Sequence, residues 1–237
     1  MRSGFGSHSA ASSRGGKKMW CIPKITPEFT ARMEDVLARY ALPYNPKEPV
    51  LCLDEKSKQL LSDAREAKPC APGKPRRTDY EYVRNGTANI FMAVEPKGGW
   101  RSARVTARRT KRDFAEEIKR IVTLRRYQTA KRLHIVLDNL NTHGEHSLVE
   151  RFGKVKAKRL MRRITFHHTP KHASWLDMAE IELSVMERQC TKKRMGDAGT
   201  LVRELQEWEK RRNNAHATID WKFTVADARR VFTYGQN

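Results

Sequence analysis

The sequence predicts an α/β fold built on a central mixed sheet, and three observations support this prediction. Short apolar runs rich in β-branched residues alternate with segments of helical periodicity. The first three predicted strands follow one another without a helix between them, as in a meander, whereas helices separate the later strands. The chain of 237 residues is long enough for one sizeable domain with helical extensions.

Local patterns predict each element. Thr26 and Pro27 open a helix that is expected to end before Pro43. Further helices are predicted to begin at Thr110 in a capping box, at about Ser174 and at about residue 197. The predicted strands cover residues 50–54, 88–95, 101–107, 133–138 and 164–168. A three-strand meander followed by alternating helices and strands is the order of a ribonuclease H-like domain.

The chain is strongly basic. It has 48 Lys and Arg residues against 27 Asp and Glu residues, which gives a formal net charge of +21 and a pI near 10.2. Such a charge favours a nucleic acid partner over the alternative, a cationic enzyme with an unrelated substrate. Charge alone predicts no sequence specificity.

The cysteines and the apolar runs exclude several classes of protein. The four cysteines are scattered, without the spacing of a zinc site, and are expected to be reduced thiols. No run approaches the roughly 18 apolar residues of a membrane span, and no apolar signal core follows the N-terminus. We therefore expect a cytoplasmic protein with no membrane association.

Two carboxylates stand where predicted strands end, and a third lies in a helical pattern. Asp54 and Asp138 each follow a short apolar run, and their strands are expected to be neighbours in the sheet. Glu180 would then reach the same edge from a helix. Convergent carboxylates suit Mg²⁺, and two such ions about 3.5–4 Å apart can cleave a phosphodiester.

Several acids have competing interpretations. Glu182 competes with Glu180, but the two point roughly 200° apart on a helix, so only one can face the ions. Asp177 either joins the metal shell or forms a capping box with Ser174. Glu55 is expected to point to the opposite face of its strand from Asp54, in a structural role.

Three motifs, in this order, resemble the DDE catalytic domain of bacterial insertion-sequence transposases of the mariner superfamily. They are Leu53-Asp54-Glu55-Lys56, the run from Leu137 to His143, and the run from Phe166 to Glu180. By position, Asp54, Asp138 and Glu180 match the three acids of the family. The resemblance implies a ribonuclease H-like fold, two Mg²⁺ or Mn²⁺ ions, DNA cleavage at transposon ends, and strand transfer of the freed 3′-hydroxyl into target DNA.

The resemblance also implies partners, and the chain departs from the family pattern in two ways. The implied partners are double-stranded DNA and a second copy of the chain on that DNA. The family has a helix-turn-helix ahead of the catalytic domain, whereas a Gly/Ser-rich leader precedes the match here. We therefore expect a truncated or downstream-frame product, with an upstream helix-turn-helix polypeptide as a further partner. The second departure is Asp177, where the family usually has Asn.

Four segments are expected along the chain. They are a disordered Gly/Ser/Arg-rich leader (1–18), an N-terminal helical linker (19–48), the ribonuclease H-like DDE catalytic domain (49–215) and a C-terminal tail (216–237).

Other polar residues are candidates for supporting roles. Asn139 and His143 follow Asp138, where a loop could present them to the metal site or the phosphate; the alternative is an ordinary surface position. The residues predicted to contact DNA are Lys56, Lys74, Arg76, Arg77, Lys154, Lys158, Arg162, Lys171 and His172. Three of them recur every fourth residue from Lys154, which predicts a basic helical stripe for backbone contact or a solvated helix face.

Two rival functions stay open at this point. A ribonuclease H-like RNase or repair nuclease would share the metal site and would cut without joining DNA ends. An inactive DNA-binding remnant of a transposase would bind DNA without cutting it.

Overall fold

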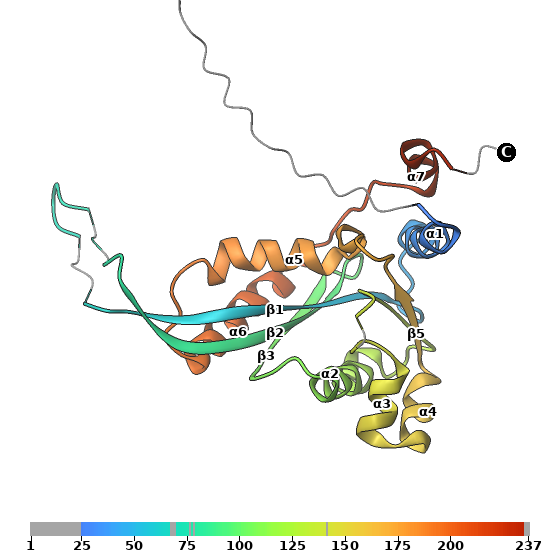
Figure 1. The fold of residues 1–237 in the computed structure, drawn as a ribbon, viewed down its shortest axis with the longest axis horizontal. Coiled ribbons are helices and arrows are strands. Elements are labelled where there is room, and N and C mark those ends of the chain that lie inside the picture. The colour runs from blue at the N-terminus through green and yellow to red at the C-terminus, as the bar shows by residue number, and fades with distance from the viewer. Residues whose placement is uncertain (1–24, 67–69, 76, 78, 141, 235–237) are drawn as a thin grey trace, which may run out of the picture.

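The computed structural model describes residues 25–234, apart from residues 67–69, 76, 78 and 141. A five-stranded sheet lies at its centre, in the order β3-β2-β1-β4-β5 (Figure 1). The strands are β1 (Val50–Asp63), β2 (Tyr82–Glu95), β3 (Trp100–Thr106), β4 (Leu133–Leu137) and β5 (Ile164–His168). The first three pair antiparallel, and β4 and β5 continue the sheet parallel to β1. The predicted mixed sheet, with its meander, is confirmed.

The predicted helices are present, but one of them begins later than predicted, and α7 lies in the segment predicted to be a tail. They are α1 (Pro27–Ala41), α2 (Lys111–Thr123), α3 (Glu145–Phe152), α4 (Lys154–Met161), α5 (Met178–Met186), α6 (Ala198–Asn214) and α7 (Val225–Phe232). Thr26 caps α1, and Thr110 opens α2 with the predicted capping box. The helix predicted from about Ser174 begins four residues later, at Met178, after a short 3₁₀ turn.

The late start of α5 has a local cause. The side chain of Asp177 accepts a hydrogen bond from the Ala179 amide at 2.8 Å, which makes Asp177 the N-cap. An aspartate in this position satisfies one of the free amides of the first turn, so the helix begins after it. The capping box predicted between Ser174 and Asp177 is therefore wrong.

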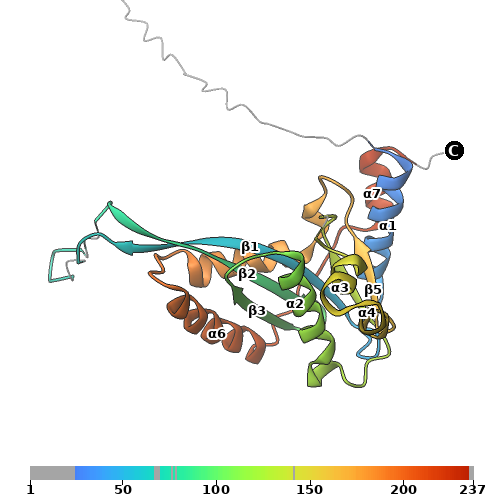
Figure 2. The same ribbon diagram turned by 60° about the horizontal axis from the view of Figure 1, so that its bottom comes forward.

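The hairpin of β1 and β2 is much longer than predicted. The sequence predicts that the first strand ends at Asp54, whereas the pairing continues to Asp63. Figure 2 shows the hairpin projecting beyond α6. Most residues of its outer part are polar, so hydrophobic periodicity gives no signal there. The loop before α6 supports it, since Leu61 donates to the Met195 carbonyl at 2.7 Å and Arg194 pairs with Asp63 at 2.6 Å.

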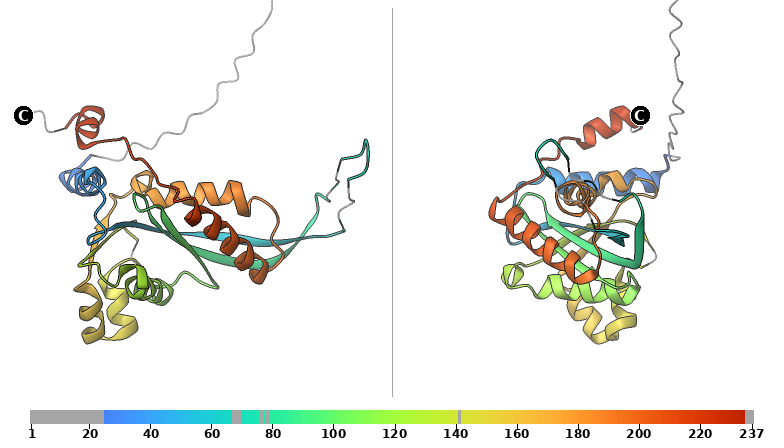
Figure 3. Two further views of the ribbon diagram at one scale, coloured as in Figure 1. Left: turned by 180° about the vertical axis from the view of Figure 1, so that it is seen from behind. Right: turned by 90° about the vertical axis from the view of Figure 1, so that its left-hand side faces the viewer.

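The two faces of the sheet bury separate cores. Cys52 and Val136 face a core shared with α1, α5 and α6, while Leu53 and Leu137 face a core shared with α2, α3 and α4. In Figures 1 and 3 the green and yellow helices α2 to α4 lie on one side of the sheet and the orange α5 lies on the other. Because side chains alternate along a strand, Asp54 continues the face of Cys52, toward α5.

The C-terminal segment returns to the first helix. Helix α7 packs on α1, with the rings of Phe232 and Phe29 at 6.2 Å between centroids. Arg229 donates to Glu34 at 2.8 Å across the same contact. Parts of the predicted linker and tail are thus packed together beside the sheet. The predicted leader, residues 1–18, lies outside the described residues, and none of the described helices is long and apolar enough to cross a membrane.

A buried ion cluster holds α5 in place. Glu182 and Arg101 have fully buried side chains, with Arg101 Nε 3.0 Å from Glu182 Oε1. Arg212 of α6 donates to both oxygens of Glu182, each at 3.0 Å. Glu182 is therefore engaged inside the fold, on the side of α5 that Arg101 of β3 and Arg212 of α6 reach.

Replacing Glu182 by Gln is expected to lower the free energy of unfolding by about 3 kcal/mol or more, because Arg101 would stay charged and buried without a carboxylate. Glu180→Gln, at a partly exposed position of the same helix, is the matched control and should change it by less than about 1 kcal/mol. Urea unfolding followed by circular dichroism measures both. Equal effects of the two substitutions would contradict the structural role of Glu182.

Candidate active site

The parallel register of β1 and β4 brings the first two predicted acids to one edge of the sheet. Leu53 pairs with Leu137 at the end of this ladder, so Asp54 and Asp138 are the next residue on each chain segment. Neighbouring strands lie about 4.8 Å apart, and residues at one register step point to the same face. The expected neighbourhood of the two strands is confirmed, and it places both carboxylates on the α5 side.

The charges of these acids influence one another. Burial raises the pKa of Asp54 to about 7, although the Glu55 amide donates a 2.7 Å hydrogen bond to its carboxylate, which favours the charged form. The negative charges of Glu55, Asp138 and Glu180 contribute to this rise in the pKa of Asp54. All three predicted acids thus belong to one electrostatic cluster, with Glu180 contributed by the first turn of α5.

Asp177 belongs to the same cluster. Its side chain is almost completely buried, and burial, followed by the charges of Asp54, Glu180 and Asp138, raises the pKa of Asp177 well above its usual range. One carboxylate oxygen caps α5, and the other is buried without a hydrogen-bond partner. A buried oxygen with free lone pairs beside three acids is a donor that a cation could use.

His143 joins the acids to the other face of the sheet. Its Nδ1 is bonded to Asp138, its Nε2 lies 3.0 Å from Glu55 Oε2, and its ring stacks on Phe114 at 4.7 Å. Burial by itself would lower the pKa of His143, but the hydrogen bonds to Asp138 and Glu55 outweigh burial and raise it to about 9. At neutral pH His143 is therefore a buried cation that donates from both ring nitrogens.

Glu55 has a place that the sequence did not predict. It lies on the face opposite to Asp54, as expected, but its carboxylate is almost fully buried against His143. Its position directly after Asp54 in the first motif was a signal for a role beside the site. The partner could not be found from spacing, because the contact depends on how the loop after β4 folds back.

The donor set fits a divalent cation by charge and by atom type. Four carboxylates lie within electrostatic reach of one another, and burial, together with the charges of the neighbouring acids, raises the pKa values of Asp54 and Asp177. Among the residues that the structure describes, no three His, Cys, Asp or Glu side chains are yet close enough together to hold an ion. Part of the reason is that His143 occupies an oxygen of Asp138. An ion would have to draw the carboxylates together.

The predicted DNA-contacting residues divide into two groups. Lys171 and His172 are exposed and line a cavity of about 270 Å³ together with Asp138 and Asn139. The others lie away from this cavity: Lys56 pairs with Glu187, Lys74 and Arg77 are exposed between β1 and β2, Lys154 and Lys158 are exposed on α4, Arg162 follows α4, and Arg76 is outside the described residues. Of the predicted DNA-contacting residues that the structure describes, Lys171 and His172 line the cavity that contains Asp138.

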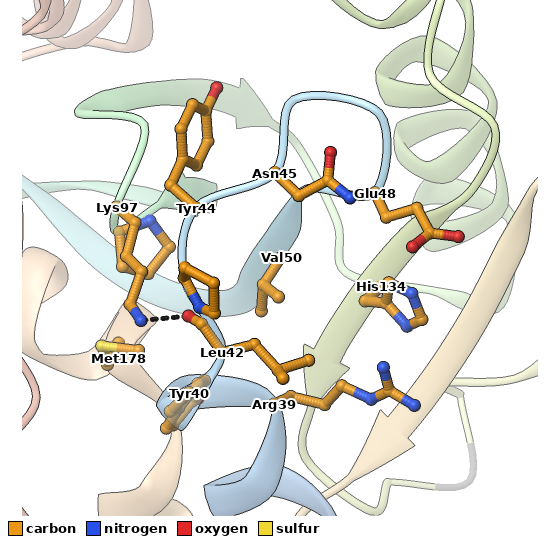
Figure 4. A pocket seen from close by; sticks show the side chains of 12 residues that line it. Arg39, Tyr40, Leu42, Tyr44, Asn45, Glu48, Val50, Lys97, His134 and Met178 are labelled. Carbon is orange, nitrogen blue, oxygen red and sulfur yellow. Dashed lines mark hydrogen bonds between the residues drawn. The ribbon is translucent and has the colours of Figure 1, made fainter.

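Another cavity of about 270 Å³ lies at the opposite end of the sheet (Figure 4). Its lining includes Val50 and His134, which stand at the beginnings of β1 and β4, and Arg39 near the end of α1. None of the four clustered carboxylates lines it. We therefore place the candidate active site at the Asp138 end of the sheet.

Replacing His143 by Gln is expected to lower the free energy of unfolding at pH 6 by about 1–3 kcal/mol, because two buried charge-assisted hydrogen bonds are lost. The folded-state pKa is raised, so this stabilisation is fully present below about pH 6.5 and is lost as the pH rises through about 9. Urea unfolding at pH 6 and pH 10 in EDTA measures the change, with the exposed His172→Gln as control. An equal loss at both pH values would indicate packing and not charge.

Replacing Asp54 by Asn is expected to stabilise the metal-free chain at pH 8. Because the pKa of Asp54 is raised to about 7 in the folded state, wild-type stability falls as the pH rises from about 4 to 7. The variant has no such loss. We therefore expect its free energy of unfolding to exceed that of the wild type by on the order of 1–3 kcal/mol at pH 8, and to equal it near pH 4. Thermal unfolding in EDTA tests this. A variant that is less stable than the wild type at pH 8 would contradict the crowding of carboxylates.

Comparison with protein families identifies the chain at the level of a family. The family model described as DDE superfamily endonuclease matches residues 49–202, which is more than half of the chain. The match contains Asp54, Asp138 and Glu180. A comparison with curated proteins gave no match.

Solved structures show a similar fold. The Mos1 mariner paired-end complex with Mn matches with a TM-score of 0.54 and 13% identity, over 84% of this chain and 60% of that chain. The Mos1 strand transfer complex matches with a TM-score of 0.53 and 12% identity, over 87% of this chain and 64% of that chain. At such identities the likeness concerns the fold alone, and this chain spans somewhat less than two thirds of the length of these Mos1 chains. Together with the family match, the fold assigns this chain to the DDE superfamily endonucleases, with the ribonuclease H-like architecture predicted from its sequence.

Proposed function

We propose that this chain is the catalytic part of a DNA transposase of the mariner type, which cuts DNA at transposon ends and joins the freed 3′-hydroxyl to target DNA. The observation that carries the proposal is the cluster of Asp54, Asp138 and Glu180 at one edge of the sheet, within a family of endonucleases. The net charge of +21 supports a polyanionic substrate. The named Mos1 complexes are a paired-end complex and a strand transfer complex, which supports the same type of reaction here.

The three acids would hold two divalent ions, Mg²⁺ or Mn²⁺. When bound, such ions activate the attacking oxygen and stabilise the leaving oxygen of a phosphodiester. Asp54 must give up its proton to become a ligand, so binding should strengthen as the pH rises toward about 7. His143 orients Asp138 through the hydrogen bond of its Nδ1. Asp177 offers its free oxygen from the start of α5.

The expected partners follow from this function. They are double-stranded DNA of the transposon ends and of the target, a second copy of the chain on that DNA, and an upstream helix-turn-helix polypeptide. The source would be a bacterial element, and the protein would act in the cytoplasm. Within it, the catalytic domain would cover residues 49–215, between the linker at 19–48 and the tail at 216–237. Asn139, Lys171 and His172 would contact the bound strand beside the acids.

The decisive experiment measures cleavage and strand transfer on a labelled duplex that carries the terminal repeat of the element. With Mn²⁺ the chain should nick and join this DNA, and EDTA should stop both reactions. Asp138→Asn and Glu180→Gln should each reduce the rate at least about a hundredfold, because each removes a metal ligand from the reaction. Asp220→Asn, at an exposed carboxylate, is the control and should retain activity.

Several outcomes would contradict the proposal. Cleavage of RNA–DNA hybrids without joining of DNA ends would indicate a nuclease of another kind. DNA binding without any cleavage in Mn²⁺ would indicate an inactive remnant. A stable covalent adduct of the chain with DNA would exclude direct attack by water or a 3′-hydroxyl.

A further inference from the structure

The cavity beside Asp138 continues toward the first helix. A second cavity, of about 360 Å³, is lined by residues of α1 and by Asn139, Pro170, Lys171 and His172. The same four residues also line the cavity that contains Asp138. The turn after β5 therefore lies between two neighbouring cavities, with Asp138 lining one and α1 lining the other. We call these two cavities together the cleft.

The lining of the second cavity contains more basic than acidic side chains. Arg32 of α1, Lys171 and His172 line it, and Glu28 of α1 is the acidic residue among its lining residues. The nearest acid is Glu28, one helical turn before Arg32, whose carboxylate pairs with Arg32 at 2.8 Å and is itself largely exposed. The positive charge of Arg32 also reaches the end of β5, where it adds to burial in lowering the pKa of His168. The surplus of positive charge fits an anion.

The backbone around this part of the cleft is arranged for an anion as well. Thr26, the N-cap of α1, lines the cavity, so the positive end of the helix dipole lies at its wall. His172 has a φ of +62°, a left-handed conformation that is uncommon for a residue other than Gly. Such strain is found most often at functional sites, and here it shapes the turn that carries Lys171 and His172.

We propose that this second part of the cleft binds a backbone phosphate of the DNA strand whose neighbouring phosphodiester is cut at the acids, with Arg32 as the principal contact. Lys171 and His172 line the path between the two phosphates. This inference rests on the proposed function and extends it, because Arg32 lies outside residues 49–202 that match the endonuclease family. Helix α1, a part of the predicted linker, would thus complete the active-site cleft.

A phosphate of the strand fits the cleft better than a free phosphate ion does. The two cavities share four lining residues, so a polymer that occupies one of them lies within reach of the other. Arg32 is held at its Nη2 by Glu28, and the planar guanidinium can present its other donors to phosphate oxygens.

The first test compares two arginines of the same helix. Arg32→Ala should reduce DNA binding and cleavage roughly tenfold, since a charge-assisted hydrogen bond to phosphate is lost. The salt dependence of DNA binding reports how many counterions are released, and Arg32→Ala should lower that number by about one. Arg39→Ala removes the same charge from the last turn of α1, at the opposite cavity, and should leave cleavage unchanged. Arg32→Lys should restore part of the loss, and thermal unfolding confirms that each variant is folded.

The second test locates the contact on the DNA. Single methylphosphonates, which are neutral, replace one phosphate at a time around the cleavage site. At one position, the methylphosphonate should weaken DNA binding by the wild type about as much as Arg32→Ala does. The Arg32→Ala variant should lose no further affinity when the methylphosphonate is at that position. Glu28→Gln, which frees Arg32, should tighten DNA binding. If the cleft binds only the strand, inorganic phosphate at millimolar concentration should weaken DNA binding by the same factor in the wild type and in every variant.

The outcomes separate this inference from the proposed function. If the wild type does not cleave DNA in Mn²⁺, the proposed function fails. If the wild type cleaves and Arg32→Ala behaves like Arg39→Ala, or if every methylphosphonate affects Arg32→Ala as it does the wild type, the role of Arg32 is wrong. If inorganic phosphate competes with DNA for the wild type and for every variant except Arg32→Ala, the cavity binds a free anion instead of the strand.

Discussion

The parallel pairing of β1 with β4 is the constraint on which the candidate active site depends. It aligns Leu53 with Leu137 and thereby carries Asp54 and Asp138 to adjacent positions at one edge of the sheet. A shift of one residue in either strand would send one of the two carboxylates to the other face, because side chains alternate. The apolar residues before each acid prevent such a shift, since they are divided between two cores that lie on opposite faces.

This pairing concentrates negative charge inside a protein with a net charge of +21. Part of the repulsion is offset by His143, a buried cation that reaches Asp138 with one nitrogen and Glu55 with the other. Asp54 and Asp177 have no comparable partner, and the pKa values of both are raised. Crowding of this kind is unfavourable for the fold alone and favourable for binding a cation, which is the usual relation between stability and function at a metal site.

Much of the fold could be predicted from the sequence where a local pattern coincides with a structural need. The apolar runs before Asp54 and Asp138 predicted strands, and Thr26 and Thr110 predicted helix starts. The outer hairpin was missed because its polar residues are held by backbone pairing and by the loop of Met195, not by burial. Glu55 with His143, and Arg32 beside His172, depend on segments distant in sequence, so no spacing rule could have found them.

The buried pair of Arg101 and Glu182 limits the ways in which the acids can come together around an ion. Glu182 is anchored to β3 and α6, so α5 can neither turn about its axis nor slide along the sheet without separating buried charges. Glu180, about 200° away on this helix, therefore has a fixed starting point for its side chain. The remaining freedom lies in side-chain torsions. Closure around an ion should accordingly be a local rearrangement of carboxylates on a stationary frame.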